Sequence, residues 1–126
     1  MFREFNPNPK QKRVGDCVIR AICAAIDREW DVVYCALLTE GFKLKDMPSA
    51  NDVWGTFLYD QGFVRGTLEN ICPSCYTVKD FCDEFNEGTY ILALPTHIIT
   101  VKNGDYYDTW DSGDEKPIYY WRRTER

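Results

Sequence analysis

The chain contains a single histidine, His97, in a segment whose pattern predicts a β-hairpin. The dipeptide Asn103-Gly104 separates two runs of alternating strand residues, which is the strongest short-range hairpin signal. With a two-residue loop at this dipeptide, His97, Asp108 and Trp110 share one face of the hairpin. Asp108 is then diagonal to His97, roughly 7 Å away between Cα atoms, and a carboxylate at that separation reaches a ring N–H. The hairpin therefore predicts an imidazole that is oriented by a carboxylate and shielded from water by the Trp110 indole.

A nucleophile to match this histidine stands near the N-terminus, at Cys17. Gly15 and Asp16 interrupt the chain before an alanine- and isoleucine-rich run with helical spacing, so Asp16 is the predicted N-cap and Cys17 falls in the first helical turn. The unpaired backbone N–H groups and the helix dipole favour a thiolate there. A cysteine at a helix start, with a distant histidine and aspartate, follows the Cys-His-Asp logic of nucleophilic catalysis.

Two motifs carry a family resemblance: Gly-Asp-Cys-x-x-Arg-Ala over residues 15–21, and Tyr-Tyr-Asp-Thr-Trp-Asp-Ser-Gly-Asp over residues 106–114. With these motifs the chain resembles the papain-like cysteine peptidase fold, and more closely a group of small uncharacterised bacterial and phage proteins. The resemblance extends from about Asn6 to Trp121, which is nearly the whole chain.

The resemblance implies a role for several side chains. Cys17 looks like the nucleophile, His97 like the general base and Asp108 like the residue that fixes the imidazole. Papain-like enzymes also place a tryptophan two residues after the orienting side chain, as Trp110 stands here. They further use a glutamine a few residues before the cysteine to help hold the oxyanion, and Gln11 fits that spacing.

Alternatives to these roles exist at each position. Asp111 is the competing third member of the triad; in the ideal register it points to the opposite face, so Asp108 is preferred, although one β-bulge would reverse the choice. A lone cysteine at a helix start or a lone histidine on a strand is more often a core residue than a catalytic one. The joint pattern favours the catalytic interpretation.

Composition limits the class of protein. The 126 residues predict a single domain over 1–126, and 44% apolar residues with 15% aromatics are typical of a globular chain. No apolar run approaches the ~20 residues needed to span a bilayer, and no secretory segment is seen, so we expect a cytoplasmic protein without membrane contact. The net charge of −5 argues against nucleic acid as a partner.

The six cysteines are expected to be reduced thiols, because disulfides are rare in the cytoplasm. Cys72 and Cys75 have the Cys-x-x-Cys spacing of zinc ligands and of redox pairs, and Cys82 could supply a third metal ligand. The single histidine is already committed to the hairpin, and no second Cys-x-x-Cys exists. A plain turn is therefore favoured over zinc and over a redox pair, and we expect no cofactor and no metal.

The chain predicts helices first and strands afterwards, which indicates an α+β fold with N-terminal helices packed on a C-terminal antiparallel sheet. Glycines, caps and apolar spacing predict helices over 17–27, 31–41 and 51–61 and a short helix after a capping box at 77–80. Alternating patterns predict strands over 88–94, 97–102, 105–110 and 118–121. A helix that carries Cys17 would then pack against a sheet that carries His97, as a papain-like arrangement requires.

The main hypothesis is a cysteine hydrolase, a peptidase or isopeptidase whose partner is a protein or peptide substrate. The alternative hypothesis is a papain-like fold that acts as a non-catalytic, host-protein-binding module. Exposed aromatic side chains would then form the interaction surface. The candidates for that surface are Tyr106, Tyr107, Tyr119, Tyr120 and Trp121. The location expected in either case is the cytoplasm, that of the host if the protein is phage-encoded, and the oligomeric state stays open.

Overall fold

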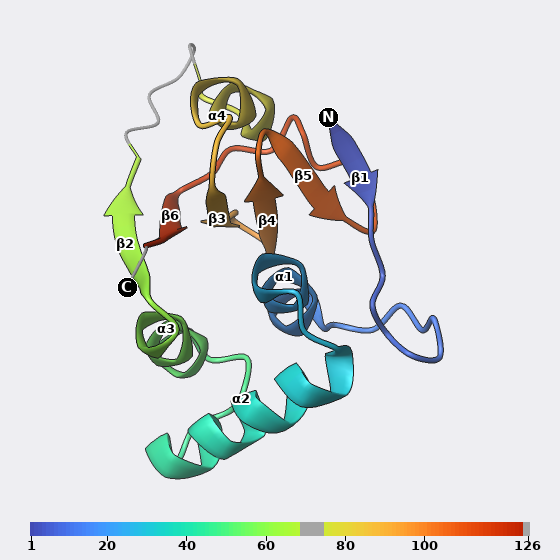
Figure 1. Cartoon of the computed structure of the whole chain (residues 1–126), viewed down its shortest axis with the longest axis vertical. Helices are drawn as coiled ribbons and strands as arrows, with labels where there is room; N and C mark the ends of the chain where they lie inside the picture. The colour runs from blue at the N-terminus through green and yellow to red at the C-terminus, as the bar shows by residue number, and fades with distance from the viewer. Residues whose placement is uncertain (69–74, 125–126) are drawn as a thin grey trace.

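A computed structural model describes residues 1–68 and 75–124 of the chain, and within them helices and strands are mixed as expected for an α+β protein (Figure 1). The helices are α1 (Cys17–Ile26), α2 (Trp30–Leu44), α3 (Asn51–Asp60) and α4 (Val78–Glu84). The strands are β1 (Phe2–Glu4), β2 (Phe63–Thr67), β3 (Thr89–Ala93), β4 (Ile98–Lys102), β5 (Asp105–Asp108) and β6 (Tyr119–Arg123). Each of the predicted helices and strands is present with ends shifted by a few residues.

The strands form one sheet in the order β1-β5-β4-β3-β6-β2. The predicted antiparallel arrangement is wrong at one edge, where β1 pairs with β5 in parallel. The N-terminal segment and β2 carried no strand prediction, because each is a short edge strand whose pairing partner lies far away in sequence. The sheet is therefore mixed.

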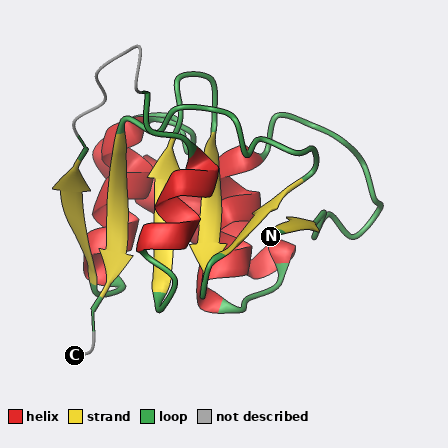
Figure 2. Cartoon of the chain, turned by 90° about the horizontal axis from the view of Figure 1, so that it is seen from above, coloured by secondary structure: helices red, strands yellow, loops and turns green. Residues whose placement is uncertain are grey.

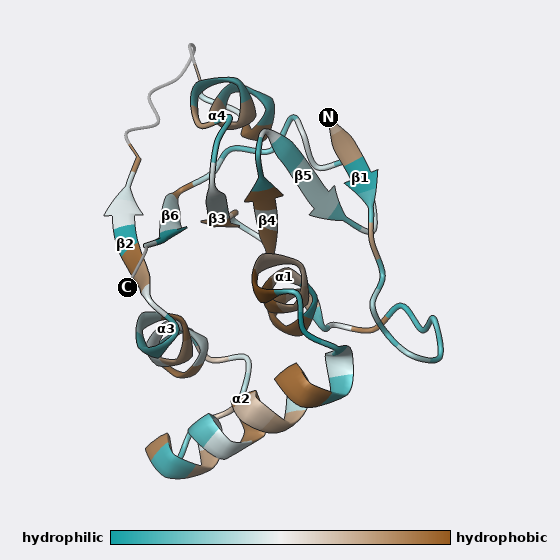
Figure 3. Cartoon of the chain, viewed as in Figure 1, coloured by the Kyte–Doolittle hydropathy of each residue, from teal (hydrophilic) through white to brown (hydrophobic). Residues whose placement is uncertain are grey.

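Helices cover both faces of this sheet (Figure 2). On one face, α1 and α3 lie next to the sheet in one core cluster with Ile91, Ala93 and Ile98, and α2 packs on α1 and α3; on the other face α4 packs against Leu92 and Ile99. Because successive side chains of a strand point to opposite faces, β3 and β4 contribute to both cores. The near-continuous burial of these two strands follows from that position. Figure 3 shows α1 and β4 as apolar elements of the centre.

The helix that carries Cys17 is held against β4. Within the core, the Thr100 hydroxyl on β4 donates a hydrogen bond to the Ala21 carbonyl of α1. Ile22 and Ala25 of α1 are fully buried in the same cluster as Ile98. Burial of the apolar face of α1, at about 25 cal/mol per Å² of area removed from water, is what stabilises the helix in this position.

The hairpin formed by β4 and β5 has the predicted turn. Asn103 and Gly104 both have positive φ angles, 51° and 83°, as a type I′ turn requires. Lys102 pairs with Asp105 across the turn, which is the register of a two-residue loop. The side-chain faces of the hairpin are therefore those that the sequence predicted.

The described part of the chain contains no helix that is long and apolar enough to cross a membrane.

Candidate active site

His97 and Asp108 are joined by a hydrogen bond, as the hairpin predicted. His97 Nε2 lies 2.7 Å from Asp108 Oδ2, and the Asp108 side chain is 0% exposed. The Ser112 hydroxyl donates to the same carboxylate at 2.8 Å, and the Thr109 backbone N–H donates at 2.7 Å. Burial by itself would raise the pKa of Asp108, but the hydrogen bonds from His97, Ser112 and Thr109 outweigh it and lower this pKa. The carboxylate is thus ionised and orients the imidazole with Nε2–H toward it.

Trp110 lies against the imidazole. The ring centroids of His97 and Trp110 are 5.1 Å apart with an interplanar angle of 35°. The indole remains 47% exposed, so part of it packs on the imidazole and the rest faces water. This contact is the one predicted from the hairpin register.

Cys17 and His97 line the same cavity, which has a volume of about 350 Å³ and is called the Cys17 cavity below. Cys17 is the first residue of α1 and is partly exposed. Among the described residues that line this cavity, only Cys17, His97 and Tyr119 are titratable. None of these lining residues is an aspartate, glutamate, lysine or arginine. Its lining residues are Gly15, Cys17, Val18, Ser49, Asn51, Trp54, Ala93, Leu94, Pro95, Thr96, His97, Ile98, Ile118 and Tyr119.

The second ring nitrogen of His97 has a different partner from the one that catalysis needs. His97 Nδ1 lies 3.1 Å from the Thr96 hydroxyl oxygen. Because Nε2–H faces Asp108, Nδ1 is the acceptor in this tautomer and Thr96 is the donor. Among the described residues, no hydrogen bond joins Cys17 to His97. The two side chains share a cavity, and the Thr96 hydroxyl occupies Nδ1 in this structure.

Behind the site lies a buried network of ion pairs and hydrogen bonds that the sequence did not predict. Arg20 on α1 donates to Asp16 at 2.7 Å and to Asp108 at 3.3 Å, and all three side chains are buried. The Trp30 indole N–H donates to the other oxygen of Asp16 at 2.9 Å. The network therefore connects Trp30 to His97 through Asp16, Arg20 and Asp108.

This network corrects the role predicted for Asp16. Asp16 occupies the N-cap position of α1, but its side chain makes no capping hydrogen bond. Its oxygens instead accept from Arg20 and Trp30. The available signal was the i,i+4 spacing of Asp16 and Arg20 within the Gly-Asp-Cys-x-x-Arg motif, which places both side chains on one helix face. The negative charge beside Cys17 is neutralised by Arg20.

Asp111, the competing third member, is held elsewhere. The Tyr106 hydroxyl and the Gly113 backbone N–H both donate to its Oδ1. The hydrogen bond from Tyr106 is the main cause that lowers the pKa of Asp111. The hydrogen bond to His97 therefore comes from Asp108, as the ideal hairpin register predicted.

Gln11 does not reach the site, so its predicted oxyanion role is wrong in this structure. Its backbone has a positive φ of 55°, and its side-chain amide donates to the carbonyls of Asn6 and Asn8 at 3.3 and 3.0 Å. The side chain closes its own loop and does not line the Cys17 cavity. Sequence spacing to Cys17 could not reveal this, because the loop between them turns away from α1.

The prediction of reduced thiols at Cys72, Cys75 and Cys82 is also corrected, at Cys75. Cys75 is disulfide-bonded rather than reduced, so it offers no thiolate to zinc. Cys82 is a buried free thiol on α4, and burial raises its pKa to about 11. Cys72 lies outside the described residues. Within the described residues, no group of three histidine, cysteine or acidic side chains is placed to hold a metal ion.

The aromatic residues proposed as an interaction surface are buried or only partly exposed. Tyr106 is 2% exposed, and Tyr119, Tyr120 and Trp121 are partly buried against the two core clusters. Tyr107 is only partly exposed on β5. Tyr106 is therefore unavailable for the surface that the binding hypothesis required, and the other four side chains are only partly available.

Comparison of the chain with family models, with curated proteins and with solved structures gives no match.

Proposed function

We propose that the protein is a cysteine hydrolase of papain-like type, with Cys17 as nucleophile, His97 as general base and Asp108 as the residue that orients the imidazole. The observation that carries the proposal is the 2.7 Å hydrogen bond between His97 Nε2 and the buried Asp108 carboxylate, on the wall of a cavity that Cys17 also lines. A histidine with a purely structural role would not require a cysteine at a helix start in the lining of the same cavity. The combination supports nucleophilic catalysis.

The first half of the reaction acylates the enzyme. His97 Nδ1 takes the proton of the Cys17 thiol, and the sulfur attacks the carbonyl carbon of the substrate. The carbonyl oxygen becomes an oxyanion, which the free N–H of Cys17 at the start of α1 can bind. His97 then gives its proton to the leaving nitrogen, the C–N bond breaks and a thioester remains on Cys17.

The second half releases the acid. Water loses a proton to His97 Nδ1 and attacks the thioester carbonyl, a C–O bond forms and the C–S bond breaks. The proton on His97 returns to the sulfur of Cys17. In both halves the imidazolium that forms is stabilised by the Asp108 carboxylate.

The substrate that this site supports best is a peptide or isopeptide. The lining of the Cys17 cavity offers backbone and neutral side-chain groups such as Asn51 and Thr96 rather than fixed charges. Asn51 can supply a hydrogen bond to a substrate amide, because its Oδ1 already accepts from Trp54 Nε1 at 3.2 Å and, among the described residues, its Nδ2–H groups have no partner. We place the activity in the cytoplasm of a bacterium or of a phage host.

Selective labelling of Cys17 tests this proposal. Iodoacetamide and a panel of thiol-reactive peptide, isopeptide and ester probes are reacted with the intact protein, and the modified peptide is identified by mass spectrometry. We expect Cys17 to react faster than Cys35, which is also free and more exposed, and His97→Ala to slow labelling at Cys17 alone. Cys35→Ala is the matched control and leaves labelling at Cys17 unchanged. Equal rates at both thiols, unaffected by His97→Ala, would overturn the proposal.

A further inference from the structure

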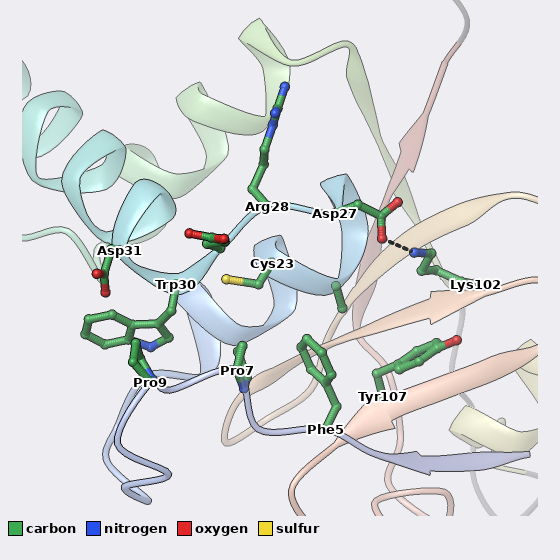
Figure 4. Close-up of a pocket in the computed structure, with 12 residues that line it drawn as sticks. Phe5, Pro7, Pro9, Cys23, Asp27, Arg28, Trp30, Asp31, Lys102 and Tyr107 are labelled. Atoms are coloured by element: carbon green, nitrogen blue, oxygen red, sulfur yellow. Dashed lines mark hydrogen bonds and ion pairs between the residues drawn. The ribbon is translucent and has the colours of Figure 1, made fainter.

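A second and larger cavity lies at the opposite end of α1 from Cys17. It has a volume of about 780 Å³ and is called the Trp30 pocket below (Figure 4). The N-terminal segment before α1, the C-terminal half of α1, the start of α2 and the β4–β5 hairpin enclose it. It shares no lining residue with the Cys17 cavity. Cavities of this size are in the range that holds small ligands or short peptide segments.

Aromatic rings form the walls of the Trp30 pocket. Phe5, Trp30 and Tyr107 all face it, and the Cys23 sulfur points into it (Figure 4). Burial raises the pKa of the Cys23 thiol to about 12, so the thiol is neutral and forms part of an apolar floor. The pocket therefore offers π faces and apolar surface to a ligand.

The Trp30 ring is fixed before any ligand arrives. It stacks on Tyr34 with ring centroids 4.9 Å apart and an interplanar angle of 18°, and its N–H is bound to Asp16. A ring held in this way loses little freedom when a second group stacks on it. Its pocket side is thus a preorganised surface for a planar or cationic group.

The charges around the pocket leave a negative excess. The lining includes three carboxylates and two cations, and the cation Lys102 pairs with Asp27 at 2.9 Å. Arg28 also lines the pocket, but its side chain extends away from the ring cluster (Figure 4). Among the described residues, neither Glu29 nor Asp31 forms an ion pair, although both line the pocket. These two acidic residues line a cavity walled by aromatic rings, in a protein whose net charge is −5.

We propose that the Trp30 pocket binds an arginine side chain within a peptide segment of a protein partner. A guanidinium stacks on an indole face and forms bidentate hydrogen bonds with carboxylates, which Lys, with its compact ammonium group, does less well. The apolar stem of arginine fits the Phe5 and Tyr107 walls. The volume exceeds that of one side chain, so flanking backbone also enters. This inference goes beyond the proposed function and does not depend on it.

The test is an NMR titration of Cys17→Ala protein, in which no proposed turnover can occur. The probes are the capped peptides acetyl-Gly-Arg-Gly-amide and its citrulline counterpart, which has nearly the same shape without the charge. We expect saturable shifts of the Trp30 indole N–H resonance with the arginine peptide, and binding about tenfold weaker with citrulline. The double variant Glu29→Gln/Asp31→Asn should reduce the affinity for the arginine peptide by a similar factor.

The matched control is Glu40→Gln/Asp60→Asn, which removes the same charge from α2 and α3 outside the pocket and should leave the affinity unchanged. Equal affinity for the two peptides would overturn the proposal, and so would shifts confined to residues outside the pocket. An equal loss in the control variant would also overturn it, because it would reduce the effect to net charge.

Discussion

Arg20 on the helix that carries Cys17 donates to Asp108, the residue that orients His97, across 3.3 Å in the core of the protein. The same guanidinium binds Asp16 at 2.7 Å. One buried cation thus connects the helix that bears the proposed nucleophile to the hairpin that bears the proposed base. The geometry of the candidate site is therefore tied to an ion-pair network rather than to the two local elements alone.

Removal of Arg20 should destabilise the fold strongly. Arg20→Ala leaves Asp16 and Asp108 as buried carboxylates without their cation, at a cost of about 3–5 kcal/mol in the free energy of unfolding. Urea unfolding followed by circular dichroism measures this cost. The control is Arg13→Ala, because the Arg13–Glu4 pair is exposed at 3.4 Å and should contribute less than about 1 kcal/mol. Similar losses in the two variants would contradict the structural role given to Arg20.

Asp108→Asn should abolish most of the proposed activity while it preserves the shape of the site. The amide can donate to His97 Nε2 and so select the wrong tautomer, and a loss of about 10⁴-fold in kcat is expected for that change. Turnover of the best acyl substrate from the probe panel measures it. Asp111→Asn is the control, because Asp111 is bound to Tyr106 rather than to His97. A loss as large in Asp111→Asn would reassign the third member.

The lowered pKa of Asp108 predicts a component of acid sensitivity. A carboxyl whose pKa is lower in the folded state stabilises the fold above its unfolded pKa of about 3.9, and this stability is lost as the pH falls through the folded pKa. Asp108→Asn should therefore show a shallower decrease in the free energy of unfolding below about pH 5. Urea unfolding at a series of pH values tests the slope. An unchanged slope would mean that the pKa of Asp108 does not differ between the folded and the unfolded protein, which would contradict the lowered pKa.

The Thr96 hydroxyl should restrain the proposed base. It occupies His97 Nδ1 at 3.1 Å, so Thr96→Val frees this nitrogen for the Cys17 thiol. A net hydrogen-bond contribution of about 0.5–1.5 kcal/mol corresponds to labelling of Cys17 that is roughly 2–12-fold faster. The labelling rate of Cys17 is measured from iodoacetamide reactions at neutral pH that are quenched after a series of times. If the rate falls instead, the hydroxyl supports the reactive state, and the competition inferred from the structure is wrong.

Trp30→Phe should lower the proposed activity, although Trp30 does not line the Cys17 cavity. The change keeps an aromatic ring but removes the N–H that Asp16 accepts at 2.9 Å. We expect kcat to fall by roughly 2–12-fold, the value of one hydrogen bond, with KM unchanged. Tyr34→Leu removes the stacking partner of Trp30 and keeps the N–H, so it serves as the control. Equal kinetic effects in both variants would indicate loss of packing rather than loss of the hydrogen bond.

The sequence alone determined the features that are local. The Asn103-Gly104 turn set the hairpin register, and that register set which face carries His97 and Asp108. The apolar spacing after Gly15 predicted where α1 begins, and Thr77 to Asp80 predicted the capping box of α4. These features depend on residues within a few positions of one another, so short-range stereochemistry is enough to predict them.

Tertiary structure alone decided the features that depend on partners far apart in the chain. The pairing of β1 with β5, the Arg20–Asp108 ion pair and the Trp30 pocket join segments separated by tens of residues. Gln11 had the right spacing before Cys17, yet its loop carries it away from the site. A pattern in the sequence states which residues are available to meet. Which of them do meet is decided by the packing of α1 on the sheet, because burial of apolar surface sets that arrangement and spacing along the chain does not.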